Sequence, residues 1–192
     1  ATLHRRQGQY SSAGIFLAQA RRQGHGYSDQ VFRQTLRLHG LINDLLQGKE
    51  PAIDEMRSAV ESLSDLHALR QETLGRWYLA LTYRGAGDEK QALEEAERAL
   101  HMAMSHGHLR LLAMELSVSA PVLALAINHG LSPEAVVGIV QKATPGCLDA
   151  LLERAPVSRS LVAATGRLVE VRGLTAKLLG GFHLFRVGRE VP

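Results

Sequence analysis

A chain of 192 residues with 45% hydrophobic residues is long enough to bury a core, and both figures lie in the ordinary range of globular domains. Leucine and alanine dominate the apolar residues while aromatics make up only 5%, which favours helices over strands. The formal net charge is +3, but the sequence has no run of five Lys or Arg residues and no aromatics interleaved with them. Direct nucleic-acid binding by the basic residues, which include Arg5 and Arg6 near the start of the sequence, is therefore disfavoured against a solvated helical surface.

Cysteine content and the length of apolar runs indicate the expected cellular location of the protein. Cys147 is the single cysteine, which excludes an intrachain disulfide framework and favours a reduced, cytoplasmic location. The longest apolar run, around residues 120–127, falls short of the roughly 20 residues that span a bilayer, so we expect no membrane contact. The first residues resemble the middle of a helix and the last come after a strand-like segment, so both ends are expected to continue into a longer protein.

Glycine-bearing turns recur along the first 145 residues. Gly8, Gly48, Gly87 and Gly130 are spaced by about forty residues, and a small residue follows each glycine by four or five places: Ala13, Ala52, Ala92 and Ala135. A second set of turns lies between them, at residues 24–28, 66–69 and 105–108. This spacing predicts two helices per repeat.

Local signals support the helices. Between Ala92 and Leu100 the apolar residues form one stripe and the charged residues take the other face, which is typical of an amphipathic helix. Asp88 is a predicted N-terminal cap, and Ser132 followed by Pro133 predicts a second helix start.

The stretch 76–100, RWYLALTYRGAGDEKQALEEAERAL, resembles a tetratricopeptide repeat. The matching positions are Leu79, Ala80 and Tyr83 in the first helix, then Gly87, Ala92, Ala96, Ala99 and Leu100 in the turn and second helix. Small residues suit these positions because the two helices of a repeat cross closely. Repeats of forty rather than thirty-four residues are similar to those in the sensor regions of large bacterial transcription regulators related to the maltose activator.

This resemblance implies an all-α fold, a tetratricopeptide-like α-solenoid of antiparallel helix pairs, with a concave groove that receives a protein or small-molecule effector. The first helices of the repeats would line that groove. The residues expected there are Arg37, Asp44, Trp77, Leu81 and Arg84. For Trp77 two interpretations stay open, because tryptophan is common both in binding hot spots and in the packing between repeats.

The pattern changes after Pro145. Residues 146–173 predict two short helices and a linker that would cap the solenoid, and residues 174–192 predict a β-hairpin with glycines at 180 and 181 between its strands. The segment 177–192, KLLGGFHLFRVGREVP, resembles the opening strands of the winged-helix domain of bacterial activators of the antibiotic-regulator type. The DNA-reading helix of that family comes after these strands, so DNA contact is expected only through a downstream domain.

Residues with reactive or metal-binding side chains give weaker signals. His101, His106 and His108 could converge on a metal, but the alternative is that they form a polar helix end. No carboxylate or thiol lies at a spacing that would complete a metal site with them. Cys147 has no nucleophile signature around it, and no phosphate-binding loop is present. We therefore expect no catalytic or metal residues, no cofactor and no enzymatic activity.

Two functions remain from the sequence. The first is a regulatory module of a bacterial transcription regulator, in which the solenoid binds an effector and signals to a DNA-binding domain. The second is a protein-interaction scaffold in which the resemblance of the hairpin is accidental. In addition, the hairpin would have unpaired edges that can pair with a second copy, giving a homodimer.

Overall fold

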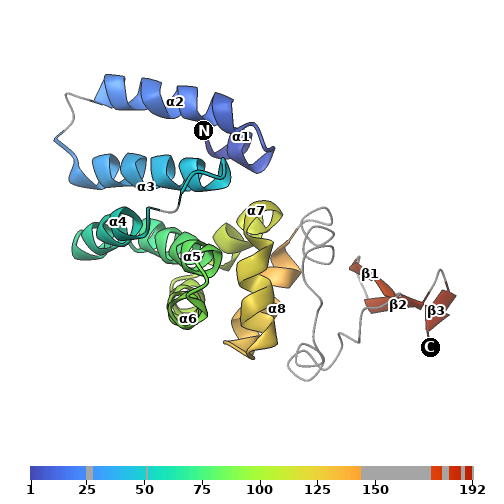
Figure 1. Cartoon of the computed structure of the whole chain (residues 1–192). Coiled ribbons are helices and arrows are strands. Elements are labelled where there is room, and N and C mark those ends of the chain that lie inside the picture. The colour runs from blue at the N-terminus through green and yellow to red at the C-terminus, as the bar shows by residue number, and fades with distance from the viewer. Residues whose placement is uncertain (25–27, 51, 144–173, 179–181, 187–188, 192) are drawn as a thin grey trace.

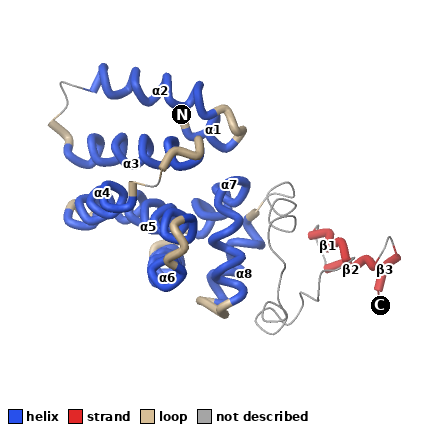
Figure 2. Tube along the Cα trace, in the orientation of Figure 1, coloured by secondary structure: helices blue, strands red, loops and turns tan. Residues whose placement is uncertain are grey.

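The computed structural model describes residues 1–24, 28–50, 52–143, 174–178, 182–186 and 189–191, the last three segments by their backbone alone. The described residues up to 143 form helices with turns between them, which confirms the all-α prediction for this part of the chain (Figures 1 and 2). The helices are α1 (Thr2–Arg6), α2 (Tyr10–Gln23), α3 (Gln30–Leu46), α4 (Ile53–Asp65), α5 (Leu69–Gly85), α6 (Glu89–Ser105), α7 (Leu109–Asn128) and α8 (Pro133–Lys142).

The predicted turns separate these helices. The four repeat glycines all have a positive φ, between 67° and 82°, a backbone conformation that only glycine adopts without strain. In the second set of turns Gly107 has a φ of 72°, whereas His67 takes a φ of 52° in the corresponding turn between α4 and α5. The four glycine turns and the turns at residues 66–69 and 105–108 therefore fall where the sequence places them, whereas residues 25–27 of the remaining predicted turn lie outside the described residues.

The two predicted helix starts differ in detail. The Asp88 carboxylate accepts a hydrogen bond from the Gln91 backbone N–H at 3.1 Å, so the predicted cap is confirmed. Pro133 begins α8 as predicted, but Ser132 makes no side-chain cap bond. Its φ of 38° lies in the left-handed region instead of the extended region of a capping serine, so the expected cap is wrong at this position.

The small residues of the repeat lie at helix crossings, with one exception. Ala13, Ala92 and Ala135 are buried near the starts of α2, α6 and α8. Ala52 is exposed, because α4 begins only at Ile53 and Ala52 is its N-terminal flanking residue. Met56, the fourth residue of α4, takes the buried position.

The helices pack in chain order. From α2 to α8 each helix contacts the next one, and α3, α5 and α7 also contact each other in turn, as do α6 and α8 (Figure 1). One contact bypasses this order, because α1 packs against α7 as well as against α2. The first and seventh helices thus lie side by side although about 110 residues separate the paired side chains.

Two buried clusters of apolar side chains meet at α5. Trp77 and Ala80 belong to the cluster that α5 forms with α6, α7 and α8, whereas Tyr78 and Leu79 belong to the cluster with α3 and α4. Helix α5 therefore packs against its neighbours on two faces and lies at the centre of the helical region. Each large side chain buried here stabilises the fold by roughly 1.5–3 kcal/mol.

Helix α7 is kinked and strongly apolar. Pro121 lies inside it and Ser119 departs from helical geometry, with φ −114° and ψ 15°, as expected where proline interrupts the backbone hydrogen bonds. Its length and mean hydropathy of 1.7 would suffice to cross a membrane, but 67% of that stretch is buried within the protein. A core helix of a folded domain has the same composition.

Three short strands come last among the described elements: β1 (Leu174–Leu178), β2 (Phe182–Arg186) and β3 (Arg189–Val191). They form an antiparallel sheet in the order β1-β2-β3, in which Leu178 is opposite Phe182. The third strand is an addition to the hairpin expected from the sequence. The expected capping helices in residues 146–173 lie outside the described residues.

Candidate functional site

The two predicted groove residues of α3 face different neighbours. The Arg37 guanidinium donates a long hydrogen bond of 3.4 Å to Ser58 Oγ on α4 and lines an open cleft of about 490 Å³ between α3 and α4. Asp44 pairs at 2.5 Å with Lys49, just beyond the end of α3, and both side chains are about half exposed. These two residues therefore do not share a site.

Trp77 is not on an open surface. Its side chain is fully buried in the cluster between α5, α6, α7 and α8, and its indole N–H donates a 2.8 Å hydrogen bond to Ser119 Oγ on α7. Of the two interpretations, packing between neighbouring helices fits the structure. The expected groove contact of Trp77 is wrong, because a buried indole with a satisfied N–H offers a partner no surface.

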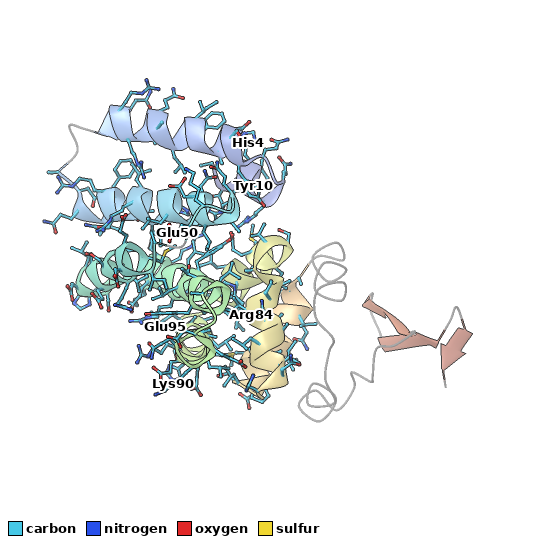
Figure 3. The ribbon with its side chains drawn as sticks, in the orientation of Figure 1. His4, Tyr10, Glu50, Arg84, Lys90 and Glu95 are labelled. Atoms are coloured by element: carbon cyan, nitrogen blue, oxygen red, sulfur yellow. The ribbon has the colours of Figure 1, made fainter. Side chains whose placement is uncertain are left out.

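The remaining two predicted residues lie further along α5. Leu81 is partly buried and packs against both apolar clusters, whereas Arg84 is exposed near the end of the helix (Figure 3). Within the described residues no hydrogen bond or ion pair joins any two of the five predicted side chains. They do not form one site.

The structure instead assembles a buried polar cluster that links α1 to α3, α5 and α7. We call it the guanidinium cluster: Arg5 and Arg6 from α1, His39 from α3, Tyr78 from α5 and Glu115 from α7. Arg5, Tyr78 and Glu115 are at most 1% exposed. Buried ionised groups are rare and occur paired, so this is the most unusual chemical environment in the described part of the chain.

The Glu115 carboxylate is the centre of the cluster. Its Oε2 accepts hydrogen bonds from Arg5 Nη2 at 3.0 Å and from the Tyr78 hydroxyl at 2.6 Å. Its Oε1 accepts two from Arg6, from Nε at 2.8 Å and from Nη2 at 2.5 Å. A carboxylate accepts about four hydrogen bonds, so both oxygens are fully used.

Arg5 reaches beyond Glu115. Its Nη1 lies 3.0 Å from His39 Nδ1, and its Cζ lies 5.4 Å from the centre of the Tyr78 ring, within cation–π distance. Because arginine only donates, Nδ1 of His39 must be the acceptor and the proton of a neutral imidazole lies on Nε2. One guanidinium therefore joins α3, α5 and α7.

The protonation states result from burial and charge. Burial and, to a smaller extent, the Arg5 charge lower the pKa of His39 from 6.5 to about 4 against the opposing effect of Glu115, so the imidazole is neutral near pH 7. Burial also raises the pKa of Tyr78 well above its ordinary value, which keeps the hydroxyl a donor. Burial alone would raise the pKa of Glu115, but Arg5, the Tyr78 hydroxyl and Arg6 outweigh it and lower this pKa.

Sequence reasoning does not find this cluster. It counts Arg5 and Arg6 in a solvated basic surface, because nothing near them in sequence indicates burial. One local signal is present: Glu115 is the only carboxylate in the mostly apolar segment 109–128. A lone carboxylate in a core helix predicts a buried cation, although it does not identify which one.

A second ionic group ties α5 to α6. Arg76 donates to Glu72 at 2.9 and 2.8 Å and to Glu95 at 2.9 Å, and Arg98 donates to Glu95 at 2.8 Å. Burial alone would lower the pKa of Arg76, but the two carboxylates raise it. Positive and negative charges balance here and come from adjacent helices, so we assign this group to the packing of α5 on α6.

The histidines of the α6–α7 turn do not converge on one point. The rings of His106 and His108 lie 6.0 Å apart, and His108 Nδ1 is 3.1 Å from the Thr73 hydroxyl. Among the described residues, no group of three or more His, Cys, Asp or Glu side chains is arranged to hold a metal ion. Cys147 lies outside the described residues.

Charge and geometry thus equip the guanidinium cluster for one kind of chemistry, which is recognition of a guanidinium by a carboxylate, an aromatic ring and a neutral imidazole.

No protein-family model, curated protein or solved structure matches this chain.

Proposed function

We propose that the chain is a regulatory, non-catalytic module of a bacterial transcription regulator, built as a tetratricopeptide-like solenoid that binds a protein or small-molecule effector. The observation that carries the proposal is the succession of three helix pairs, α3–α4, α5–α6 and α7–α8, each with a positive-φ glycine in its internal turn. Each pair repeats the same local structure at an interval of about forty residues.

The packing order supports a solenoid. Each helix contacts its neighbours in sequence, and the first helices of successive pairs, α3, α5 and α7, contact each other in a row. In a solenoid such a row lines the concave face. Stability is then spread over contacts between neighbouring repeats, so a ligand on this face can change the angle between repeats and transmit a signal along the chain.

A regulatory role is proposed from the C-terminal segment. Strands β1, β2 and β3 fall in the stretch that resembles the start of a winged-helix domain, and their antiparallel order is compatible with that resemblance. Under this proposal the effector acts on a DNA-binding domain downstream of residue 192, the protein works in the cytoplasm, and free edges of the strands allow pairing with a second copy.

The competing proposal is a tetratricopeptide-like scaffold with no role in transcription. The same helix packing supports it equally. The two proposals differ in the kind of domain expected downstream of the strands and in whether ligand binding alters DNA affinity.

The test is a titration of the longer protein, including the sequence beyond residue 192, with DNA from upstream of its own operon. Binding would be measured at several salt concentrations, with and without candidate effectors. An effector that changes the DNA affinity at least tenfold supports the regulator. The 1–192 chain is the control, and it should show only weak attraction that disappears as salt rises. No DNA binding by the longer protein at any salt would leave the scaffold.

A further inference from the structure

We propose that His39, Tyr78 and Glu115 form a binding site for an arginine side chain of a partner peptide, and that α1 of the same chain fills this site in the present structure. The inference rests on the proposed partner-binding role of the α3–α5–α7 face and specifies its ligand chemistry.

The three residues come from three successive odd-numbered helices and each supplies a different interaction. Glu115 supplies the negative charge, Tyr78 supplies a ring face and a hydroxyl that fixes the carboxylate, and His39 supplies a neutral acceptor. Only one of the three is charged, and the cations that compensate Glu115 among the described residues are both arginines of α1. A buried carboxylate without a cation is strongly unfavourable, which creates the demand for a cationic ligand.

The geometry selects arginine over lysine. The two terminal nitrogens of the Arg5 guanidinium bind different helices, Nη1 at His39 and Nη2 at Glu115, both at 3.0 Å. Its Cζ also lies near the Tyr78 ring. A lysine ammonium is a compact point charge that cannot span both acceptors and cannot stack on the ring as a flat group.

Helix α1 reaches the site with its arginines. It is joined to α2 through a turn at Gly8 with φ 73°, and its Leu3 is 65% exposed. Its arginines, and not this apolar side chain, therefore hold it against α7. A peptide that carries arginines in the same spacing could form the same hydrogen bonds.

The fit of α1 leaves hydrogen-bonding capacity unused. Arg5 Nε and Asn43 Oδ1, one turn beyond His39 on α3, are both buried and have no hydrogen-bond partner among the described residues. Unpaired buried donors and acceptors weaken the bound state. A partner arginine whose nitrogens are all paired avoids the cost of the unpaired Arg5 Nε and can displace α1, although it must overcome the high effective concentration of a tethered competitor, which is on the order of millimolar.

The experiment uses the full chain with Arg5→Ala and Arg6→Ala, which empties the site while keeping Glu115. The probe is the synthetic peptide ATLHRRQGQ, the sequence of residues 1–9, and the control peptide carries lysine in place of both arginines. Calorimetric titration should show that the arginine peptide binds the double variant at least tenfold more tightly than the lysine peptide does. It should also bind the double variant at least tenfold more tightly than the unaltered chain, where α1 competes.

A triple variant that adds Glu115→Gln is the matched control and should lose at least tenfold in affinity. Equal affinity for the two peptides, or binding that survives Glu115→Gln, would overturn the proposal. If the double variant does not fold alone, the helical circular dichroism signal becomes the measurement. Recovery with the arginine peptide but not the lysine peptide supports the site, and no recovery at millimolar peptide rejects it. Either result is independent of whether an effector alters DNA binding by the longer protein.

Discussion

At the scale of single residues, Glu115 determines the chemistry of the helical region. It is fully buried and accepts four hydrogen bonds from three side chains, so its charge is compensated by neighbours rather than by water. This arrangement stabilises the fold only when all its hydrogen bonds are formed, because each lost donor leaves part of a buried carboxylate unpaired.

Replacing Tyr78 by Phe should therefore destabilise the chain by about 1.5–3 kcal/mol, since it removes a 2.6 Å hydrogen bond to a buried charge and little else. The shift in the midpoint of urea unfolding measures the loss. Tyr83→Phe is the matched control. Its hydroxyl accepts from the solvent-exposed Arg57, which water can solvate in its place, so a smaller loss is expected. Equal losses for the two variants would contradict a special role of the carboxylate.

At the scale of elements, α5 depends on close approach to its neighbours. Gly75 faces α4 and α3, and a Cβ atom placed there would lie 2.7 Å from Val60 Cγ2 and 3.4 Å from Leu38 Cδ2. Both neighbours are buried, and a branched valine side chain has little freedom to move aside. The absent side chain thus allows three helices to meet.

Gly75→Ala should destabilise the chain by about 1–3 kcal/mol through overpacking. Gly85→Ala, at the C-terminal end of the same helix, should be neutral or stabilise by up to about 1 kcal/mol, because nothing lies within 4 Å of its added Cβ and alanine favours helix. Thermal unfolding of both variants against the unaltered chain checks the pair. A stabilised Gly75→Ala variant would show that the α4–α5 contact is loose enough to admit a methyl group.

Helix boundaries could be predicted because their causes are local. A glycine with positive φ and a capping aspartate act within a few residues, so Gly87 and Asp88 fix the start of α6 from sequence alone. His67 could not be predicted, because its side chain carries no strong preference for a positive φ of 52°. The expected position of Ala52 inside the helix was wrong for a related reason, since the longer connection after Gly48 shifts the start of α4 to Ile53.

The guanidinium cluster could not be predicted, because it depends on contacts between residues that are far apart in the sequence. Arg5 and Glu115 are separated by 110 residues, and their contact depends on how the intervening helices curve back on each other. Sequence periodicity identifies the face of a helix that is buried, but it does not identify which helix lies against it. Trp77 illustrates the same limit, because its burial depends on α7 and on Ser119.

At the scale of the whole molecule, the guanidinium cluster should make stability depend on pH. The pKa of His39 is about 4 in the folded chain and 6.5 in the unfolded chain. Between these values the unfolded chain binds a proton that the folded chain excludes, so stability falls as the pH drops from 7 toward 4. The charged side chains that face this imidazole are Arg5 and Arg6, which disfavour its protonation, and Glu115, which favours it.

We expect urea unfolding to give about 2 kcal/mol less stability at pH 5 than at pH 7 from this residue. His39→Gln keeps an acceptor for Arg5 but cannot titrate, so it should remove most of that difference. The lowered pKa of Glu115 adds a further loss only within and below the ordinary carboxylate range, near pH 4. An unchanged slope in His39→Gln would mean that other groups carry the pH dependence.

The hydrogen bond between Trp77 and Ser119 allows the guanidinium cluster to be followed by tryptophan fluorescence. Trp77 is the single tryptophan of the chain, and its ring is buried against α7, with Ser119 one helical turn from Glu115. The Ser119 hydroxyl also donates to the Glu115 backbone carbonyl at 2.9 Å, so the indole is coupled to the turn that holds the carboxylate. All tryptophan fluorescence of this protein therefore originates beside the guanidinium cluster, and a change of emission wavelength is a change in that environment.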